Sequence, residues 1–164
     1  MYRLMSFALL VSVVYGQCPN GYLHHGESCY AIPATPATWS QAAMYCTVLG
    51  ADLAVIESSA EQVYIEGFLQ RMAGAFPSDK DFWIGGGDFL EHGTWIWVKT
   101  QEEINPEASF WATGQPASAT QHQACLRLSE TTGYRWEAGS CDSPEYFICE
   151  KPYVIPESGV PVGK

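Results

Sequence analysis

Residues 125–149, CLRLSETTGYRWEAGSCDSPEYFIC, decide the fold of this chain. The stretch holds Cys125, Cys141 and Cys149, which are half of the cysteines in the protein. Its apolar ends, residues 124–128 and 146–149, predict strands on either side of a Gly- and Ser-rich middle. Trp136 stands shortly before Cys141. The stretch therefore predicts strands that loops join and cysteines hold together.

The size and charge of the chain narrow the range of functions that it can have. Its 164 residues are enough for one ordinary domain, and a hydrophobic content of 47% predicts a packed core. The formal net charge is −10. Such an acidic surface repels nucleic acid and anionic membranes, and it is compatible with neutral sugars, cations or basic proteins.

The first 16 residues, MYRLMSFALLVSVVYG, have the pattern of a secretory signal peptide. Arg3 supplies the positive charge, residues 4–14 form the apolar segment, and Val14 and Gly16 are small enough to precede a cleavage site. The apolar run is shorter than the roughly 20 residues that a membrane span needs. We therefore expect a secreted, extracellular protein with no membrane insertion. Residues 152–164 are rich in Pro and Gly, and we expect them to form a flexible tail.

Six cysteines, an even number, in a secreted chain predict disulfides. A zinc site is the alternative, but the chain has no C-x-x-C motif and no Cys/His cluster at ligand spacing. Cysteine spacing alone does not choose among the possible pairings.

Two helices are predicted before the middle of the chain. Thr38 and Gln41 form a capping-box pattern that starts the first helix, and Gly50 is a natural end for it. Ser58 and Glu61 form the same pattern at the start of the second. One apolar stripe of the second helix is expected to pack on a sheet: Tyr64, Ile65, Phe68 and Leu69.

Three further strands and a long loop follow from the remaining pattern. Residues 53–56, 82–85 and 95–98 are short apolar runs that predict strands. Residues 99–123 show little periodicity, and they contain the pair Phe110-Trp111 and the turn Gly114-Gln115-Pro116.

These features together resemble the long form of the C-type lectin-like domain family, over about residues 18–151. The resemblance rests on the order of the six cysteines, Trp83-Ile84-Gly85, Gln115-Pro116, and Trp136 before Cys141. It implies an α+β fold with two helices packed on mixed antiparallel sheets and a long irregular ligand loop, as a domain over residues 17–151. It also implies three disulfides: Cys18–Cys29, Cys46–Cys149 and Cys125–Cys141.

In sugar-binding members of this family, the long loop and the strand after it hold a calcium ion, which two vicinal hydroxyls of the sugar chelate. The resemblance places Gln115, Gln123 and Glu137 at ligand positions, with Pro116 as the usually cis proline of the motif. Ala117 and Ala138 stand where the family has side chains with oxygen atoms. Calcium prefers six to eight hard oxygens with several carboxylates. With one charged ligand left, we expect calcium to bind weakly or not at all.

The other calcium positions of the family are also depleted. The resemblance matches Asp88 to one ligand, whereas His92, Ser118 and Ala124 stand where it implies acidic residues. Without the ion, a sugar could be held by stacking and amide hydrogen bonds from Trp111, Gln115, His122, Gln123 and Glu137. Trp111 and Trp136 have the alternative role of core residues.

The sequence contains no G-x-S-x-G, H-E-x-x-H or P-loop motif, so we do not expect an enzyme. Two binding functions remain. The first is a secreted lectin that recognises glycans or glycoproteins, of galactose type if Gln115-Pro116 acts as it does in the family, in innate immune recognition. The second is a structural or protein-binding module, for example an acidic extracellular or biomineral matrix protein. With all cysteines in disulfides, the expected state is a monomer or a non-covalent oligomer.

Overall fold

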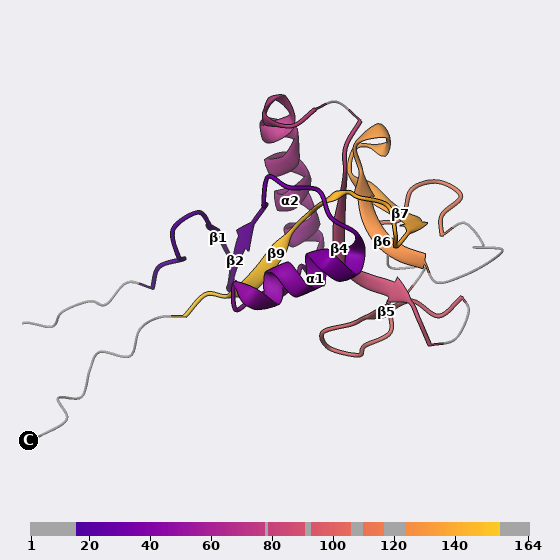
Figure 1. Ribbon diagram of the computed structural model, residues 1–164, viewed down its shortest axis with the longest axis horizontal. Helices are drawn as coiled ribbons and strands as arrows, with labels where there is room; N and C mark the ends of the chain where they lie inside the picture. Colours follow the sequence, from indigo (N-terminus) through magenta and orange to yellow (C-terminus); the bar gives the residue numbers. More distant parts are fainter. Residues whose placement is uncertain (1–15, 78, 91–92, 106–109, 117–123, 155–164) are drawn as a thin grey trace, which may run out of the picture.

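The computed structural model describes residues 16–77, 79–90, 93–105, 110–116 and 124–154. Residues 1–15 of the predicted signal peptide, which spans residues 1–16, and the tail beyond Val154 lie outside these residues. The fold is α+β, as predicted, with two α-helices, two sheets and two short 3-10 turns (Figure 1). The helical elements are α1 Trp39–Val48, α2 Ser59–Met72, η1 Ala73–Ala75 and η2 Glu130–Thr132. The strands are β1 Leu23–His25, β2 Ser28–Ala31, β3 Asp52–Leu53, β4 Asp81–Asp88, β5 Ile96–Trp97, β6 Ala124–Ser129, β7 Arg135–Ser140, β8 Tyr146–Phe147 and β9 Cys149–Pro152.

Helix α1 begins and ends where the sequence predicts. The Gln41 N–H donates to the Thr38 hydroxyl at 3.4 Å, and the Gln41 side chain accepts from the Thr38 N–H at 3.2 Å. Gly50 follows the helix with a φ of +64°, a conformation that glycine adopts without steric cost. The capping box and the glycine stop are both confirmed.

Helix α2 begins as predicted, but its first turn differs in one respect. The Glu61 N–H donates to the Ser58 hydroxyl at 3.2 Å, whereas the Glu61 carboxylate accepts from the Glu57 N–H at 2.9 Å and from the Tyr30 hydroxyl. Only half of the reciprocal box therefore forms, because Tyr30 on β2 draws the carboxylate toward the first sheet. Ile65 and Leu69 are buried in the core, as the apolar stripe predicts.

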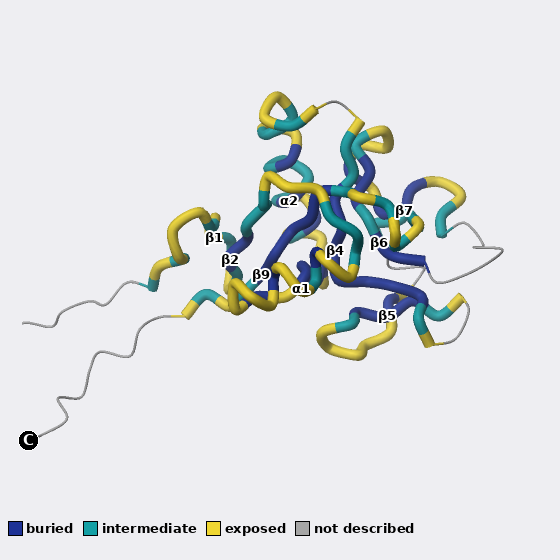
Figure 2. The backbone as a smooth tube through the Cα atoms, viewed as in Figure 1, coloured by how far each residue is buried: buried dark blue, intermediate teal, exposed yellow. Residues whose placement is uncertain are grey.

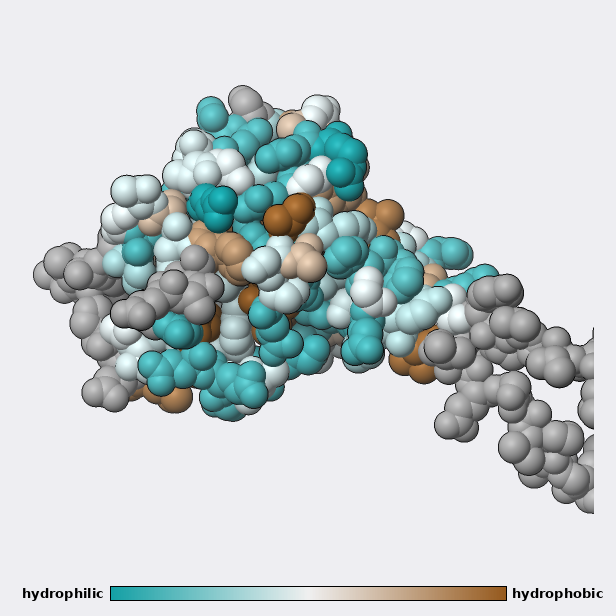
Figure 3. Space-filling view, turned by 180° about the vertical axis from the view of Figure 1, so that it is seen from behind, coloured by the Kyte–Doolittle hydropathy of each residue, from teal (hydrophilic) through white to brown (hydrophobic). Residues whose placement is uncertain are grey.

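The strands form two sheets. The first has the order β1-β2-β9-β3 and is antiparallel throughout. The second has the order β5-β4-β6-β7, with β8 added parallel to β4. In Figure 2 the buried backbone is concentrated in β4, β6 and β9. The far side of the molecule, seen in Figure 3, is mostly hydrophilic with small separate apolar areas.

Two predicted strands are organised differently in the structure. Residues 146–149 do not form one strand: β8 pairs with β4 in the second sheet, and β9 pairs with β2 and β3 in the first. Ile148 lies between them and links the sheets, because its N–H donates to the Trp83 carbonyl and its carbonyl accepts from the Ala54 N–H. Of the predicted strand at residues 53–56, only Leu53 joins a ladder, although all four residues are buried.

The three disulfides join the cysteines predicted from the family resemblance: Cys18–Cys29, Cys46–Cys149 and Cys125–Cys141. Cys46–Cys149 ties α1 to β9 across 103 residues of sequence. Both of these cysteines lie in a core cluster with Trp83, whose indole N–H donates to the Ala37 carbonyl at 3.1 Å. The crosslinks therefore tie the N-terminal segment to β2, α1 to β9, and β6 to the residue after β7.

The two ends of the described chain lie side by side (Figure 1). The Tyr153 N–H donates to the Glu27 carbonyl at 2.7 Å, its ring stacks on His24 at 3.9 Å, and its hydroxyl donates to the Gly16 carbonyl. Strand β9 ends at Pro152, so the first residues of the predicted tail still contact the domain. Among the described residues, no helix is both long and apolar enough to cross a bilayer.

Candidate functional site

The candidate site is built where the long loop returns to the edge strand β7. The Trp136 N–H donates to the Phe110 carbonyl at 2.9 Å, and the Ala112 N–H donates to the Trp136 carbonyl at 2.9 Å. Trp111 and Trp136 thereby form a parallel bridge. Because β7 is the last strand of its sheet, this bridge covers the sheet edge and fixes the segment that leads to Gln115.

Two hydrogen bonds fix Gln115, one within the loop and one to β7. Its N–H donates to the Ala112 carbonyl at 2.9 Å, and its side-chain Oε1 accepts from the Ala138 N–H at 3.2 Å. The peptide bond from Gln115 to Pro116 is cis, the form that the family motif predicts. The amide oxygen that the family resemblance places at a calcium-ligand position therefore accepts a hydrogen bond from the backbone of β7.

Glu137 lies on the other face of β7. Strand alternation directs Trp136 and Ala138 toward the main core cluster and Glu137 away from it. Glu137 is opposite Arg127 in the register of β6 and β7, and its Oε2 lies 3.5 Å from Arg127 Nη2. Both residues are thus positioned by β7, but their side chains contact different partners. Gln115 contacts the Ala138 N–H, and Glu137 contacts the Arg127 guanidinium.

Arg127 was missed by the sequence analysis, and it organises this face of the second sheet. Arg127 Nη1 lies 2.8 Å from Asp81 Oδ2 and 3.6 Å from Glu145 Oε1, so three carboxylates share one guanidinium. Burial, and then the charge of Asp81, raise the pKa of Glu145 above its ordinary value. One signal for this role was available: Arg127 is the only cation between the apolar residues of β6 in a chain with few cations.

Trp111 packs at the edge of the core. Its ring meets Trp95 at 4.9 Å and Trp136 at 5.8 Å, both edge to face. The side chain is half-buried, and its indole N–H has no hydrogen-bond partner among the described residues. Trp136 is buried and donates its indole N–H to Gln62 Oε1 at 2.8 Å. Trp136 thus lies in the core and Trp111 packs against it, which is the alternative role that the sequence analysis gave them.

The remaining predicted site residues lie in or near the long loop. His122 and Gln123 fall outside the described residues, as do Ala117, Ser118 and His92. Asp88 is buried, and its Oδ2 accepts from the Gly93 N–H at 2.9 Å, so this carboxylate holds the turn after β4.

The described residues do not fit a family-type calcium ion. Ala138 offers no side-chain oxygen, Gln115 Oε1 accepts a backbone hydrogen bond, and the Glu137 carboxylate contacts Arg127. Over residues 16–154, excluding the undescribed gaps, no three acidic, His or Cys side chains lie close enough to bind one metal ion. Calcium requires several converging oxygens with negative charge, and these side chains supply their oxygens to other partners.

The fold and the site define a disulfide-linked binding domain that presents a long loop beside an edge strand. A family model for the C-type lectin domain matches residues 35–151. Perlucin from Haliotis laevigata is 34% identical over 82% of this chain and 83% of its own length. The chain therefore belongs to the C-type lectin domain family, whose members are binding proteins rather than enzymes.

Two solved structures show the range of sites on this fold. A calcium-independent type II antifreeze protein is 26% identical, with a TM-score of 0.70 over 85% of this chain and 98% of that one. A complex of SPL-1 with GlcNAc is 25% identical, with a TM-score of 0.69 over 82% of this chain and 94% of that one. The fold thus occurs both with a bound sugar and in a protein described as calcium-independent.

Proposed function

We propose that this C-type lectin domain is a secreted lectin whose loop-and-strand site recognises glycans without depending on calcium. Family membership supports glycan recognition. Three disulfides and the predicted signal peptide at residues 1–16 support an extracellular location, because disulfides persist in oxidising compartments. A secreted domain of this kind suits the recognition of glycans on microbial surfaces, which is the immune role we assign to it.

One observation carries the calcium-independent part of the proposal. The hydrogen bond from the Ala138 N–H to Gln115 Oε1 joins the two segments that the family bridges with a calcium ion. In this proposal, the direct hydrogen bond positions the loop on β7, as the calcium ion does in the family. We assign Gln115 and Pro116, with His122 and Gln123 of the undescribed segment, to sugar contact. Glu137 and Trp111 hold β7 and the loop in place.

Galactose-terminated glycans are the first ligands to test, because Gln-Pro is the galactose-type form of the family motif. The test is a glycan array probed with the full secreted protein in calcium and in a chelator. We expect the same glycans to bind with intensities within about twofold in both conditions, since a factor of two corresponds to only a few tenths of a kcal/mol.

Gln115→Ala should lower glycan binding, because it removes the amide that fixes the loop on β7. Gln70→Ala is the matched control, since Gln70 is exposed on α2, far along the chain from the loop. Loss of all glycan binding in chelator would overturn the proposal. It would assign the site to a calcium ion whose ligands lie in the segment outside the described residues.

A different part of the molecule supports the alternative function, which is a structural or protein-binding module. An acidic hollow beside β5 carries no family sugar-site residue, and it suits a basic partner. The two functions are compatible, because neither Gln115 nor Glu137 lines the hollow.

A further inference from the structure

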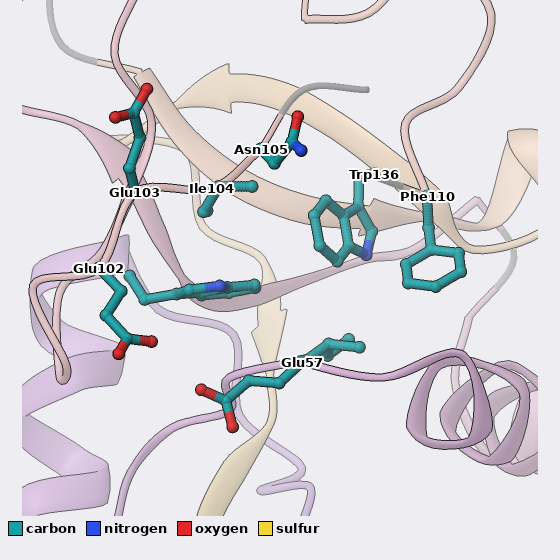
Figure 4. Close-up of a pocket in the computed structure, with 9 residues that line it drawn as sticks. Glu57, Glu102, Glu103, Ile104, Asn105, Phe110 and Trp136 are labelled. Carbon is teal, nitrogen blue, oxygen red and sulfur yellow. The ribbon is translucent and has the colours of Figure 1, made fainter. Parts of the chain in front are cut away.

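A hollow of about 220 Å³ opens between β5, the loop after it and the segment before α2 (Figure 4). Its base is apolar and includes the buried rings of Trp97 and Trp136, with the half-buried ring of Phe110 at one side. Glu57, Glu102 and Glu103 stand around it and are exposed. The hollow therefore combines aromatic walls with a rim that carries only negative charge among its described residues.

The backbone that supports the rim is fixed by hydrogen bonds. The Trp97 N–H donates to the Glu102 carbonyl at 2.9 Å, and Glu103 forms a bridge with Ile96. On the opposite side, the Glu57 N–H donates to the Glu61 carboxylate at 2.9 Å. Two segments far apart in sequence thus bring Glu57, Glu102 and Glu103 to the lining of one hollow, with the Glu57 and Glu102 carboxylates on one side and the Glu103 carboxylate on the other (Figure 4).

The rim carboxylates have no ion-pair partner in the described part of the chain. Its ion pairs join Lys99 to Asp52, Arg135 to Glu66, and Arg127 to its three carboxylates. The chain carries a net charge of −10, so no excess of its own cations is available to neutralise the rim. The acidic surface attracts cations from outside the protein, and the exposed rim is open to them.

We propose that this hollow binds the side chain of an arginine or lysine in a basic segment of a partner protein. The apolar stem of such a side chain packs on aromatic rings, and its charged head meets carboxylates or the face of a ring. The hollow is smaller than the roughly 300–1,000 Å³ of sites that take whole small molecules, so it matches one side chain better.

A metal ion is a poorer match than an organic cation. Among the described residues, no three acidic, His or Cys groups converge closely enough for one ion. A guanidinium carries five N–H donors on a planar frame and so reaches carboxylates that stand apart. Gln115 and Glu137 do not line the hollow, so substitutions of the rim glutamates leave those two residues of the glycan site unchanged.

The test measures fluorescence anisotropy of a labelled peptide, acetyl-Gly-Arg-Gly-Arg-Gly-Arg-Gly-amide, against the full secreted chain in 0.15 M salt. A peptide with neutral citrulline at each arginine is the ligand control. The site variant is Glu57→Gln/Glu102→Gln/Glu103→Gln. The matched variant, Glu27→Gln/Asp79→Asn/Asp142→Asn, removes the same charge from exposed positions outside the hollow.

We expect the arginine peptide to bind the parent protein and the citrulline peptide to bind at least about tenfold more weakly. The site variant should lose about tenfold in affinity, and the matched variant about twofold or less, because distant exposed charges are screened at this salt concentration. Each variant replaces exposed side chains only, so unchanged thermal unfolding verifies the fold.

Three results would overturn the proposal. The first is an equal loss of affinity in the two triple variants, which would indicate attraction by net charge alone. The second is equal affinity of the parent for the arginine and citrulline peptides. The third is no measurable binding of the arginine peptide to the parent. The same variants on the glycan array should behave as the parent does, which separates a failure of this site from a failure of the lectin proposal.

Discussion

Two groups of three carboxylates in this domain have opposite surroundings. Asp81, Glu137 and Glu145 are mostly buried around Arg127, with side-chain exposures of 14%, 14% and 18%. Glu57, Glu102 and Glu103 are exposed around a hollow and have no cation among the described residues. The first group uses its charge to hold strands together. The second leaves its charge available to a partner, so equal numbers of acidic residues serve stability in one region and recognition in the other.

The largest expected effect comes from removing the cation of the first group. Arg127→Gln leaves three mostly buried carboxylates without a counter-ion, so we expect a loss of about 3 kcal/mol in the free energy of unfolding. Urea unfolding at pH 7 measures it. Arg135→Gln is the control, because Arg135 is 48% exposed and pairs with Glu66 at 3.7 Å, and it should cost less than about 1 kcal/mol. Equal effects of the two changes would contradict a structural role for the first group.

A designed change can move a carboxylate from one face of β7 to the other. We expect the combination Ala117→Asp, Gln123→Glu, Glu137→Asn and Ala138→Asp to restore the family's calcium ligands. Calcium at a hundred times its Kd should then add about 2.7 kcal/mol of stability, whereas it should leave the parent nearly unchanged. Thermal unfolding in calcium and in chelator measures both proteins. A parent that is stabilised as much as the variant would show that its own loop already binds calcium.

The second group can be given an internal cation. Asn105→Lys places an ammonium at the edge of the hollow, where it competes for the rim carboxylates. We expect about a fivefold to tenfold loss in affinity for the arginine peptide, equivalent to about 1 kcal/mol. Asn20→Lys changes the net charge equally at an exposed site near the first disulfide, and it should alter the affinity by less than about twofold. If both lysines weaken the peptide equally, the hollow has no special part in binding.

The smallest effect concerns pH and the first group. Because the folded-state pKa of Glu145 is raised, the stabilisation linked to its proton is present below the ordinary value of 4.5 and is lost as pH rises through the folded value. Glu145→Gln lacks this linkage, so the stability of the parent relative to the variant should be higher at pH 5 than at pH 7. Melting temperatures at the two pH values test this. A difference that grows toward pH 7 instead would contradict the burial argument.

The sequence predicted those parts of the fold that depend on local patterns. Thr38 with Gln41 and Gly50 placed α1, because caps involve residues a few positions apart. The cysteine pairing also followed, but only through the family resemblance, since spacing alone leaves it open. Residues 146–149 were assigned to one strand because their apolar run is continuous, and nothing local shows that the chain changes sheet at Ile148.

The sequence identified several residues of the site, but it did not predict which partners their side chains contact. Gln115 and its cis proline were identified from the motif, whereas its bond to the Ala138 N–H depends on the bridge that brings two distant segments together. Arg127 took Glu137 as a partner through the β6–β7 register, which the sequence does not specify. The hollow was missed for the same reason: Glu57 and Glu102 are 45 positions apart in number, and only tertiary packing makes them neighbours.

The contacts of Tyr153 with His24 and Glu27 near the start of the domain have a consequence for how the domain is mounted. Both ends of the described chain leave on the side away from β5 and the long loop (Figure 1). A domain with adjacent ends can be inserted into another protein, or strung in tandem, with little disturbance of its fold. Anchoring this domain by either end to a bead, a sensor chip or a neighbouring module would leave its recognition surface facing outward. Arrays of copies would then present many such surfaces to one target, which raises the overall strength of attachment without any new contact.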